Sequence, residues 1–240
     1  MKRLSTVLMG AAVAAFAGEG AANAAVAEKT DEHWGGPMSQ HVWLDAQAGV
    51  EEVQLQTFSA NGDTLGVGLL PASGVGPTLR AGAGVRFGFL TLGLRGRVAT
   101  FENESASSSV TSWNIWSLDA ELGVRVPLRT IEPHIALAGG YSSFGGFNDA
   151  VNGLGAGLDV HGVDGRLDAG VDFWVTHALS LGVNASGELL ALARPGVSVR
   201  DLATPQQVGT LNEAKARVLE ANGSSVGSAL ALTANLGVHF

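Results

Sequence analysis

The sequence predicts an all-β fold: a closed, antiparallel transmembrane β-barrel of about eight strands, with short periplasmic turns and long extracellular loops. Three observations lead to this prediction. Apolar and polar side chains alternate over segments of roughly ten residues, the length that a tilted strand needs to cross a bilayer. Short and long connections alternate between these segments. The mean hydropathy is positive, yet no stretch after the N-terminus is long and apolar enough for a spanning helix, which leaves a soluble all-β core or a transmembrane barrel.

The N-terminus has the three parts of a secretory signal. Lys2 and Arg3 form a basic start, and residues 8–17 form a short apolar core. Ala22 and Ala24 then form an A-x-A cleavage site. The apolar core is shorter than the ~20 residues that a membrane-spanning helix needs, and the alternative is a buried N-terminal helix. We therefore expect a signal peptide, a periplasmic N-terminal lead and an outer-membrane β-barrel domain over residues 1–24, 25–40 and 41–240.

The composition excludes several classes of protein. The chain contains no cysteine, which excludes a lipid-modified precursor, a disulfide-stapled domain and a thiol enzyme. The formal net charge is −8, and only Lys29 and Lys215 remain of the lysines after the signal. Nucleic acid is therefore not an expected partner, because binding it needs clustered positive charge.

The first four alternating segments are residues 42–51, 78–88, 91–101 and 113–126. In each of them every second residue is apolar or small, as at Leu44 and Leu122. The intervening positions carry the charges, which are Asp45, Glu51, Arg80, Arg86, Arg95, Arg97, Asp119, Glu121 and Arg125. Because successive side chains of a strand point to opposite faces, we expect the apolar parity to face lipid and the charged parity to face the lumen.

The last four segments are residues 133–142, 162–175, 179–190 and 226–240. Residues 133–142 alternate least clearly, with Ile135 and Leu137 set against His134. The charges of these segments again share one parity and are Asp164, Arg166, Asp168, Asp172 and Glu188. A charge on the lipid face costs about 2–4 kcal/mol at the bilayer midplane, so this parity too is expected to point inward.

The inward charges predict a network inside the barrel. An eight-stranded barrel is just wide enough for its own side chains, and unpaired buried charge is costly. We therefore expect a salt-bridged plug, with a narrow or gated polar path as the alternative. Besides Asp45 and Glu51, the expected lumen charge network is Arg80, Arg86, Arg95, Arg97, Arg125, Arg166, Asp119, Glu121, Asp164, Asp168, Asp172 and Glu188.

The connections favour a membrane barrel over a soluble sandwich. The short ones are residues 88–90, 127–132 and 176–178. The long ones are residues 52–77, 102–112, 143–161 and 191–225. Outer-membrane barrels place short turns in the periplasm and long loops outside, whereas a soluble sandwich gives no reason for lengths to alternate.

Two further patterns lie near the segment ends. The aromatic residues there predict partial girdles at the membrane interfaces, with ordinary packing as the alternative. They are Trp43, Trp113, Trp116, Tyr141, Phe144 and Trp174.

In the last long loop, Thr210 and Glu213 form a capping box that predicts a helix over about 210–221. This helix would pack over the barrel mouth, or alternatively act as a lid or recognition element.

The C-terminus carries the most specific pattern, an alternating apolar run that ends in an aromatic residue. Its residues are Leu232, Ala234, Leu236, Val238 and Phe240. Here the chain resembles the small bacterial outer-membrane barrels of the OmpA-domain, OmpX and OmpW type, in the porin superfamily; members often have an aromatic residue where Val238 stands. The resemblance implies the bacterial outer membrane, and recognition of Leu236, Val238 and Phe240 by the barrel-assembly machinery. It also implies a monomer whose partners are outer-membrane lipid and lipopolysaccharide.

No catalytic, cofactor-binding or metal-binding constellation is present in the sequence. No histidine is followed by serine two positions on, no G-x-S-x-G elbow occurs, and no metal-ligand spacing is found. The leading expectation is therefore a non-catalytic integral outer-membrane barrel that supports envelope integrity and presents extracellular loops. The alternatives are a narrow or gated channel for small solutes and, because some small barrels modify lipids, a lipid-modifying enzyme.

Overall fold

The computed structural model describes residues 41–56, 59–60, 63–64, 73–103, 110–128, 130–149, 160–195 and 222–240. The expected signal peptide and lead, residues 1–24 and 25–40, lie outside this part of the chain, as does the helix expected at about 210–221. Within the described ranges, no helix is long and apolar enough to cross a membrane.

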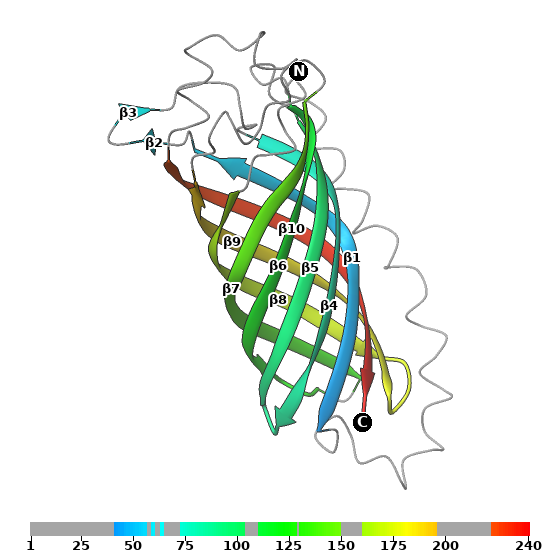
Figure 1. Ribbon diagram of the computed structural model, residues 1–240. Helices are drawn as coiled ribbons and strands as arrows, with labels where there is room; N and C mark the ends of the chain where they lie inside the picture. Colours follow the sequence, from blue (N-terminus) through cyan, green and yellow to red (C-terminus); the bar gives the residue numbers. More distant parts are fainter. Residues whose placement is uncertain are drawn as a thin grey trace, which may run out of the picture. The chain divides into compact units, whose positions relative to one another are not determined.

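In the described part of the chain, eight long strands form one closed antiparallel sheet (Figure 1). They are β1 (Val42–Leu55), β4 (Ser73–Phe87), β5 (Leu90–Asn103), β6 (Val110–Arg125), β7 (Ile131–Asp149), β8 (Val160–Trp174), β9 (Leu179–Arg194) and β10 (Gly223–His239). Two short strands, β2 (Ser59–Ala60) and β3 (Asp63–Thr64), form a small ladder beside β10. The predicted all-β barrel of about eight strands is confirmed.

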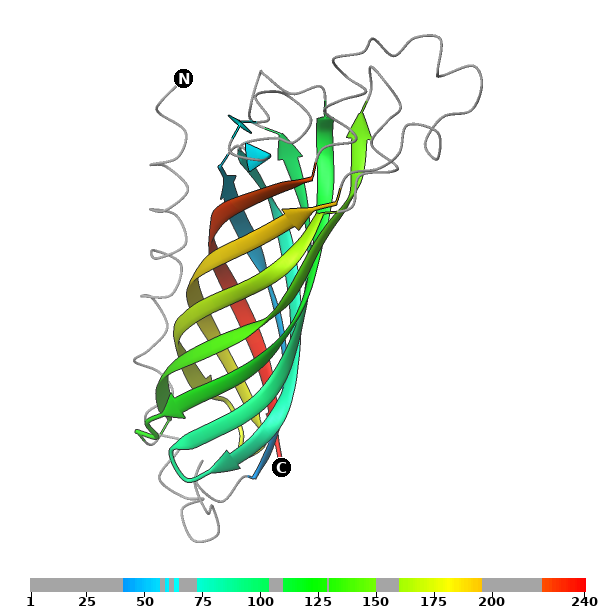
Figure 2. The ribbon, with the colours of Figure 1, turned by 60° about the vertical axis from the view of Figure 1, so that its left-hand side comes forward.

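The first and last long strands close the barrel. β1 and β10 pair from Trp43 opposite His239 to Leu55 opposite Gly227. The backbone of Phe240 extends this seam, because its carbonyl oxygen accepts the N–H of Val42 at 3.0 Å and its N–H donates to the Val42 carbonyl at 2.8 Å. Closure leaves none of the eight long strands with an unpaired side, which is the condition for crossing lipid with strands (Figure 2).

Short connections join the strands at one end of the barrel, called here the turn end. Gly88, between β4 and β5, has a φ of 62°, which favours glycine. Between β8 and β9, the hydroxyl of Thr176 accepts the N–H groups of Ala178 and Leu179 at 3.2 and 3.1 Å. The C-terminus lies at this same end (Figure 1). The predicted alternation is confirmed, since the longer connections all lie at the opposite end, called here the loop end.

The strands are longer than predicted, and the main extension is at the loop end. β1 reaches Leu55 where residue 51 was expected, and β7 reaches Asp149 where residue 142 was expected. The sequence-based prediction ended each strand where its outward positions cease to be apolar. The backbone ladder continues past these points because strand pairing depends on backbone N–H and C=O groups, which every residue except proline supplies.

The outer surface of the barrel is a broad apolar belt. Leu79, Leu137 and Leu230 are 57, 64 and 66% exposed, and apolar residues of every long strand share this outward face. A soluble protein does not expose a continuous apolar surface of this extent. The belt and the closed sheet together make the protein a transmembrane β-barrel of the outer-membrane kind.

Candidate functional site: the barrel lumen

The inward parity fills the lumen with charged side chains. The six arginines of the expected network are buried, and each lies within ion-pair distance of a carboxylate. The carboxylates they contact are Asp45, Glu51, Asp119, Glu121, Glu132, Asp168, Asp172 and Glu188. Asp164 also points inward and accepts a hydrogen bond from the hydroxyl of Ser142.

A lower network occupies the turn end of the lumen. Arg86 donates to both carboxylate oxygens of Glu132, at 3.0 and 2.9 Å. Arg125 lies between Glu132 at 3.2 Å and Asp172 at 2.5 Å, and Asp172 also accepts the Asn235 amide at 2.6 Å. Sequence reasoning missed Glu132 because it placed this residue in a turn. Its shared parity with His134, which points inward, was the signal that could have found it.

Arg95 lies between the two networks and contacts side chains of two other strands. Its guanidinium donates to Asp45 at 2.8 Å on one side and to Glu121 at 2.6 Å on the other. The ring of Trp43 lies 5.7 Å from the guanidinium carbon, which is within the range of a cation–π contact. Arg95 thus ties β5 to β1 and β6 across the interior.

An upper network continues toward the loop end. Glu51 accepts from Arg80 at 3.2 Å and from Arg97 at 2.9 Å. Arg97 also pairs with Glu188. Arg166 then joins Asp119 at 2.6 Å to Asp168 at 2.8 Å, and Arg80 reaches Asp168 at 3.4 Å. These contacts link seven side chains, which are Glu51, Arg80, Arg97, Asp119, Arg166, Asp168 and Glu188.

The networks leave little free space between them. A cavity bounded by Arg95, Glu121, Arg125, His134 and Asn184 measures about 10 Å³, which is room for about one water molecule. His134 and Asn184 narrow it further, because their Nε2 and Oδ1 atoms are 2.7 Å apart. A cavity of this size is too small to form a continuous aqueous path by itself.

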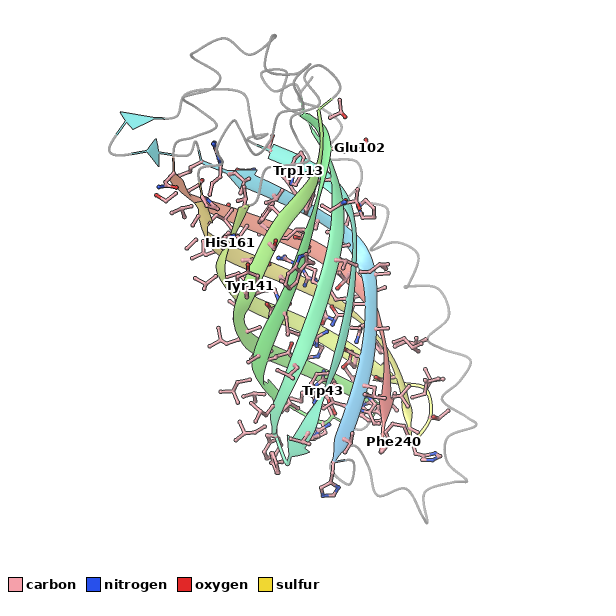
Figure 3. All side chains as sticks on the ribbon, viewed as in Figure 1. Trp43, Glu102, Trp113, Tyr141, His161 and Phe240 are labelled. Atoms are coloured by element: carbon pink, nitrogen blue, oxygen red, sulfur yellow. The ribbon has the colours of Figure 1, made fainter. Side chains whose placement is uncertain are left out.

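Beyond the upper network most inward side chains are apolar, although Arg194 and Ser225 are also buried there. Phe101 and Trp113 are 0 and 1% exposed, and their ring centres are 5.5 Å apart. We call this inner layer the apolar cap; it consists of Val53, Leu55, Ala99, Phe101, Trp113, Ile115, Phe144, Val160, Leu190 and Leu192. Figure 3 shows Trp113 near the loop end and Trp43 near the turn end.

The predicted aromatic girdle is wrong for four of its six residues. Trp43, Trp113, Phe144 and Trp174 are buried inside the barrel, where the alternative of ordinary packing applies. Trp116 and Tyr141 do face outward, at 49 and 42% exposed. Proximity to a strand end says nothing about the face on which a side chain lies; parity decides that, and these four share the parity of the lumen charges.

Glycines on the inner face make room for the large side chains opposite them. Gly82, Gly84 and Gly93, on β4 and β5, border the ring of Trp43. Gly74 borders the ring of Trp113 in the same way. The abundance of glycine in the chain, 34 residues, is in these strands a means of fitting indole rings and ion pairs into a narrow lumen.

Adding a methyl group to Gly93 should destabilise the barrel by about 1–3 kcal/mol, the usual effect of overpacking a filled interior. The new Cβ would lie 2.9 Å from Cη2 of Trp43 and 2.7 Å from the carbonyl oxygen of Ala83. Urea unfolding of Gly93→Ala in lipid vesicles measures this change. Gly165→Ala is the matched control, because nothing lies within 4 Å of the added methyl; equal stability losses in the two variants would contradict the explanation.

The lumen is arranged to hold its own charges. The six arginines of the expected network are paired with carboxylates, and Asp164 is hydrogen-bonded to Ser142. Among the described residues, no group of three or more histidine, aspartate and glutamate side chains is placed to hold a metal ion. In chemical terms, this site cross-links the strands and fills the interior.

Comparisons with known proteins give distant likenesses. No family model matches the chain, and no curated protein matches it. Among solved structures, Neisserial surface protein A is 15% identical and covers 83% of this chain and 97% of its own, with a TM-score of 0.47. The outer membrane protein OprG from Pseudomonas aeruginosa is 12% identical and covers 84 and 97%, with a TM-score of 0.48. The outer membrane enzyme PagL is 15% identical and covers 80 and 97%, with a TM-score of 0.37.

Proposed function

We propose that this small outer-membrane β-barrel works without catalysis, as a closed anchor that supports the envelope and presents the segments joining its strands at the loop end. The observation that carries the proposal is the filled lumen. Ion-paired side chains occupy it from Arg86 at the turn end to Arg97, and the apolar cap follows.

Electrostatics support a closed interior. A solute or ion moving through the lumen would have to separate buried pairs such as Arg95 with Glu121 and Arg166 with Asp119. Separating a buried pair leaves charge without a partner in a low-dielectric interior, which is strongly unfavourable. The networks therefore favour a plug that also cross-links strands far apart in the sequence.

The apolar cap adds a second barrier in series with the first. Phe101, Ile115 and Phe144 contribute to it from three neighbouring strands and are at most 2% exposed. A narrow constriction lined by apolar side chains excludes water and so blocks ions even without a charged barrier.

The proposal includes orientation and partners. The turn end lies in the periplasm, as short turns do in this class of barrel, and the loop end faces outside. The apolar belt takes outer-membrane lipid, including lipopolysaccharide, as its partner. A closed sheet offers no free strand edge to a second copy, so we propose a monomer, and Phe240 at the turn end is the contact for the barrel-assembly machinery.

In planar bilayers, the purified protein is expected to show no steady single-channel conductance. A variant that combines Arg97→Ser with Trp113→Ser should leak, because it shortens one side chain in each barrier; its fold is checked by the mobility shift on heating that small barrels show in detergent gels. Steady conductance of the unmodified protein that changes on neutralising Arg95 or Asp168 would overturn the proposal in favour of the narrow channel.

Lipid analysis of a deletion strain distinguishes the non-catalytic barrel from a lipid-modifying enzyme. A deletion strain should keep its lipid A and phospholipid profiles if the barrel is non-catalytic. An altered profile that the plasmid-borne gene restores would contradict the non-catalytic part of the proposal and leave the closed lumen untouched.

A further inference from the structure

The outer face of the barrel changes character at one level along its length. On β1 the outward residues from Val42 to Val50 are apolar, and the next two are Glu52 and Gln54. On β5 the change falls between Val98 and Thr100. On six strands the first outward residue beyond the change is polar, and these residues are Glu52, Thr100, Asn114, Ser143, His161 and Ser228.

The inner face changes in the opposite sense at the same level. On β1, Glu51 of the upper network is followed on the inner face by Val53 of the apolar cap. On β9, Glu188 is followed in the same way by Leu190. Toward the turn end the inner face is charged and the outer face is apolar. Toward the loop end the inner face is largely apolar, and the first outward residue is polar on six of the eight long strands. We call this level the transition level.

The strand register shows that the transition level is a ring around the barrel. The apolar outward residues at this level are Val50, Leu79, Val98, Trp116, Tyr141, Val163, Leu189 and Leu230. Beyond it, Val75 on β4, Ala191 on β9 and Val226 on β10 are still apolar and point outward. Leu79, Val98 and Trp116 are direct partners on three neighbouring strands, and Tyr141 is the partner of Val163. Around the barrel from β1 through β4 to β10 and back to β1, the other five pairings are offset. At each of them, the ring residue on the next strand lies two residues nearer the turn end than the direct partner. A level ring on tilted strands makes steps of this kind.

The strand lengths agree with one hydrocarbon layer between the turn end and the transition level. A tilted strand crosses the hydrocarbon layer in about 9–11 residues, and the long strands have 14 to 19. Apolar outward residues continue down to the turn end, where Phe87 is 66% exposed and Phe173 is 47% exposed. The surplus residues therefore all lie beyond the transition level, at the loop end.

We infer that the hydrocarbon layer ends at the transition level and that the strands continue beyond it as a collar embedded in the hydrated headgroup layer of the outer leaflet. Each half of the barrel then has the polarity its surroundings require. Acyl chains surround the apolar belt, and the charges turn inward. Water and polar headgroups surround the collar, whose core is apolar like that of a soluble barrel.

Aromatic side chains mark the boundary on one side of the barrel. Trp116 and Tyr141 lie on the outer face with ring centres 5.5 Å apart, and the ring of His161 stacks on Tyr141 at 6.0 Å. Figure 3 shows Tyr141 and His161 between Trp43 near the turn end and Glu102 near the loop end. Rings with one apolar and one polar part favour the interface between acyl chains and headgroups.

Single cysteines test this inference cleanly, because the chain has none of its own. Glu102→Cys and Gln54→Cys report on the collar, and Leu94→Cys and Leu44→Cys are their matched controls in the belt, on the same two strands. All four side chains point outward. Each variant of the full mature chain is refolded into phospholipid vesicles, and folding is checked by heat-dependent gel mobility. It is then exposed to a water-soluble maleimide and, after labelling with a fluorophore in the unfolded state, to lipids with nitroxides on the acyl chain or on the headgroup.

The collar cysteines should label as fast as in the unfolded chain and be quenched by headgroup nitroxides. The belt cysteines should stay unlabelled until the chain is unfolded and be quenched by acyl-chain nitroxides. The inference is overturned if Glu102→Cys and Gln54→Cys are quenched mainly by acyl-chain nitroxides, or if Leu94→Cys and Leu44→Cys label in the folded barrel. Cysteine labelling and quenching do not depend on whether the lumen conducts, so the inference can fail while the closed-anchor proposal stands.

Discussion

Replacing Arg97 by alanine should lower the free energy of unfolding by about 3–5 kcal/mol, the usual penalty for removing one partner of a buried ion pair. Arg97 is fully buried and pairs with Glu51 and Glu188, which have side chains 0 and 2% exposed. Glu51 keeps Arg80 at 3.2 Å, so most of the effect should come from Glu188. Urea titration of the barrel in lipid vesicles, followed by tryptophan fluorescence, measures the loss.

A second variant separates lost pairing from lost packing. Arg97→Met combined with Glu188→Leu removes both charges and keeps much of the volume, and such replacements of buried pairs are often neutral or better. The double variant should therefore recover most of the stability that Arg97→Ala loses. Glu52→Gln is the control for a charge on the outer face, and it should change little. A loss below about 1 kcal/mol for Arg97→Ala would mean that the lumen is far more hydrated than the contacts indicate.

Phe240→Ala should sharply reduce the amount of folded barrel that reaches the outer membrane in cells, while the purified protein refolds normally. The side chain of Phe240 is 63% exposed, and only its backbone takes part in the seam with β1. Alanine keeps that backbone pairing. A defect confined to cells would therefore identify the side chain as a recognition element for assembly, and quantitative blotting of outer-membrane fractions measures it.

Phe89→Ala is the matched control for this experiment. Phe89 is also a phenylalanine at the turn end and is 52% exposed, but it lies in the connection between β4 and β5. Both variants lose one phenyl ring from the same end of the barrel. If the two variants lower the folded amount equally, or if Phe240→Ala also fails to refold when purified, the side chain acts through stability and the assembly explanation is wrong.

Parity explains both the successes and the errors of the sequence-based predictions. Arg95 and Arg97 were placed on one face because they are two residues apart in an alternating run, and the structure has both inside. Phe101 and Trp113 share that parity and were not included in the lumen. Trp113 was assigned to an aromatic girdle because it lies near a segment end, and Phe101 was assigned to neither face. Following the period of two through the end of each apolar run would have located the apolar cap.

Other features depend on contacts that no local pattern contains. Arg80 meets Asp168, 88 residues away, because the closed sheet brings β4 and β8 across the lumen from each other. Glu132 joins Arg86 to Arg125 because the strand β7 begins at Ile131, two residues earlier than its weak alternation indicated. Such partners are set by the stagger between strands and by the lengths of side chains that reach across the interior.

The amino-acid sequence alone determined the class of fold, the face on which each charge of the expected network lies and the end of the barrel that carries the short turns. It did so because alternation and turn lengths are properties of neighbouring residues, and lipid penalises any other arrangement. The tertiary structure alone decided which charges pair and that the changes of polarity on the separate strands lie at one level around the barrel. Those outcomes follow from barrel closure and register, which bring together residues that are distant in the chain.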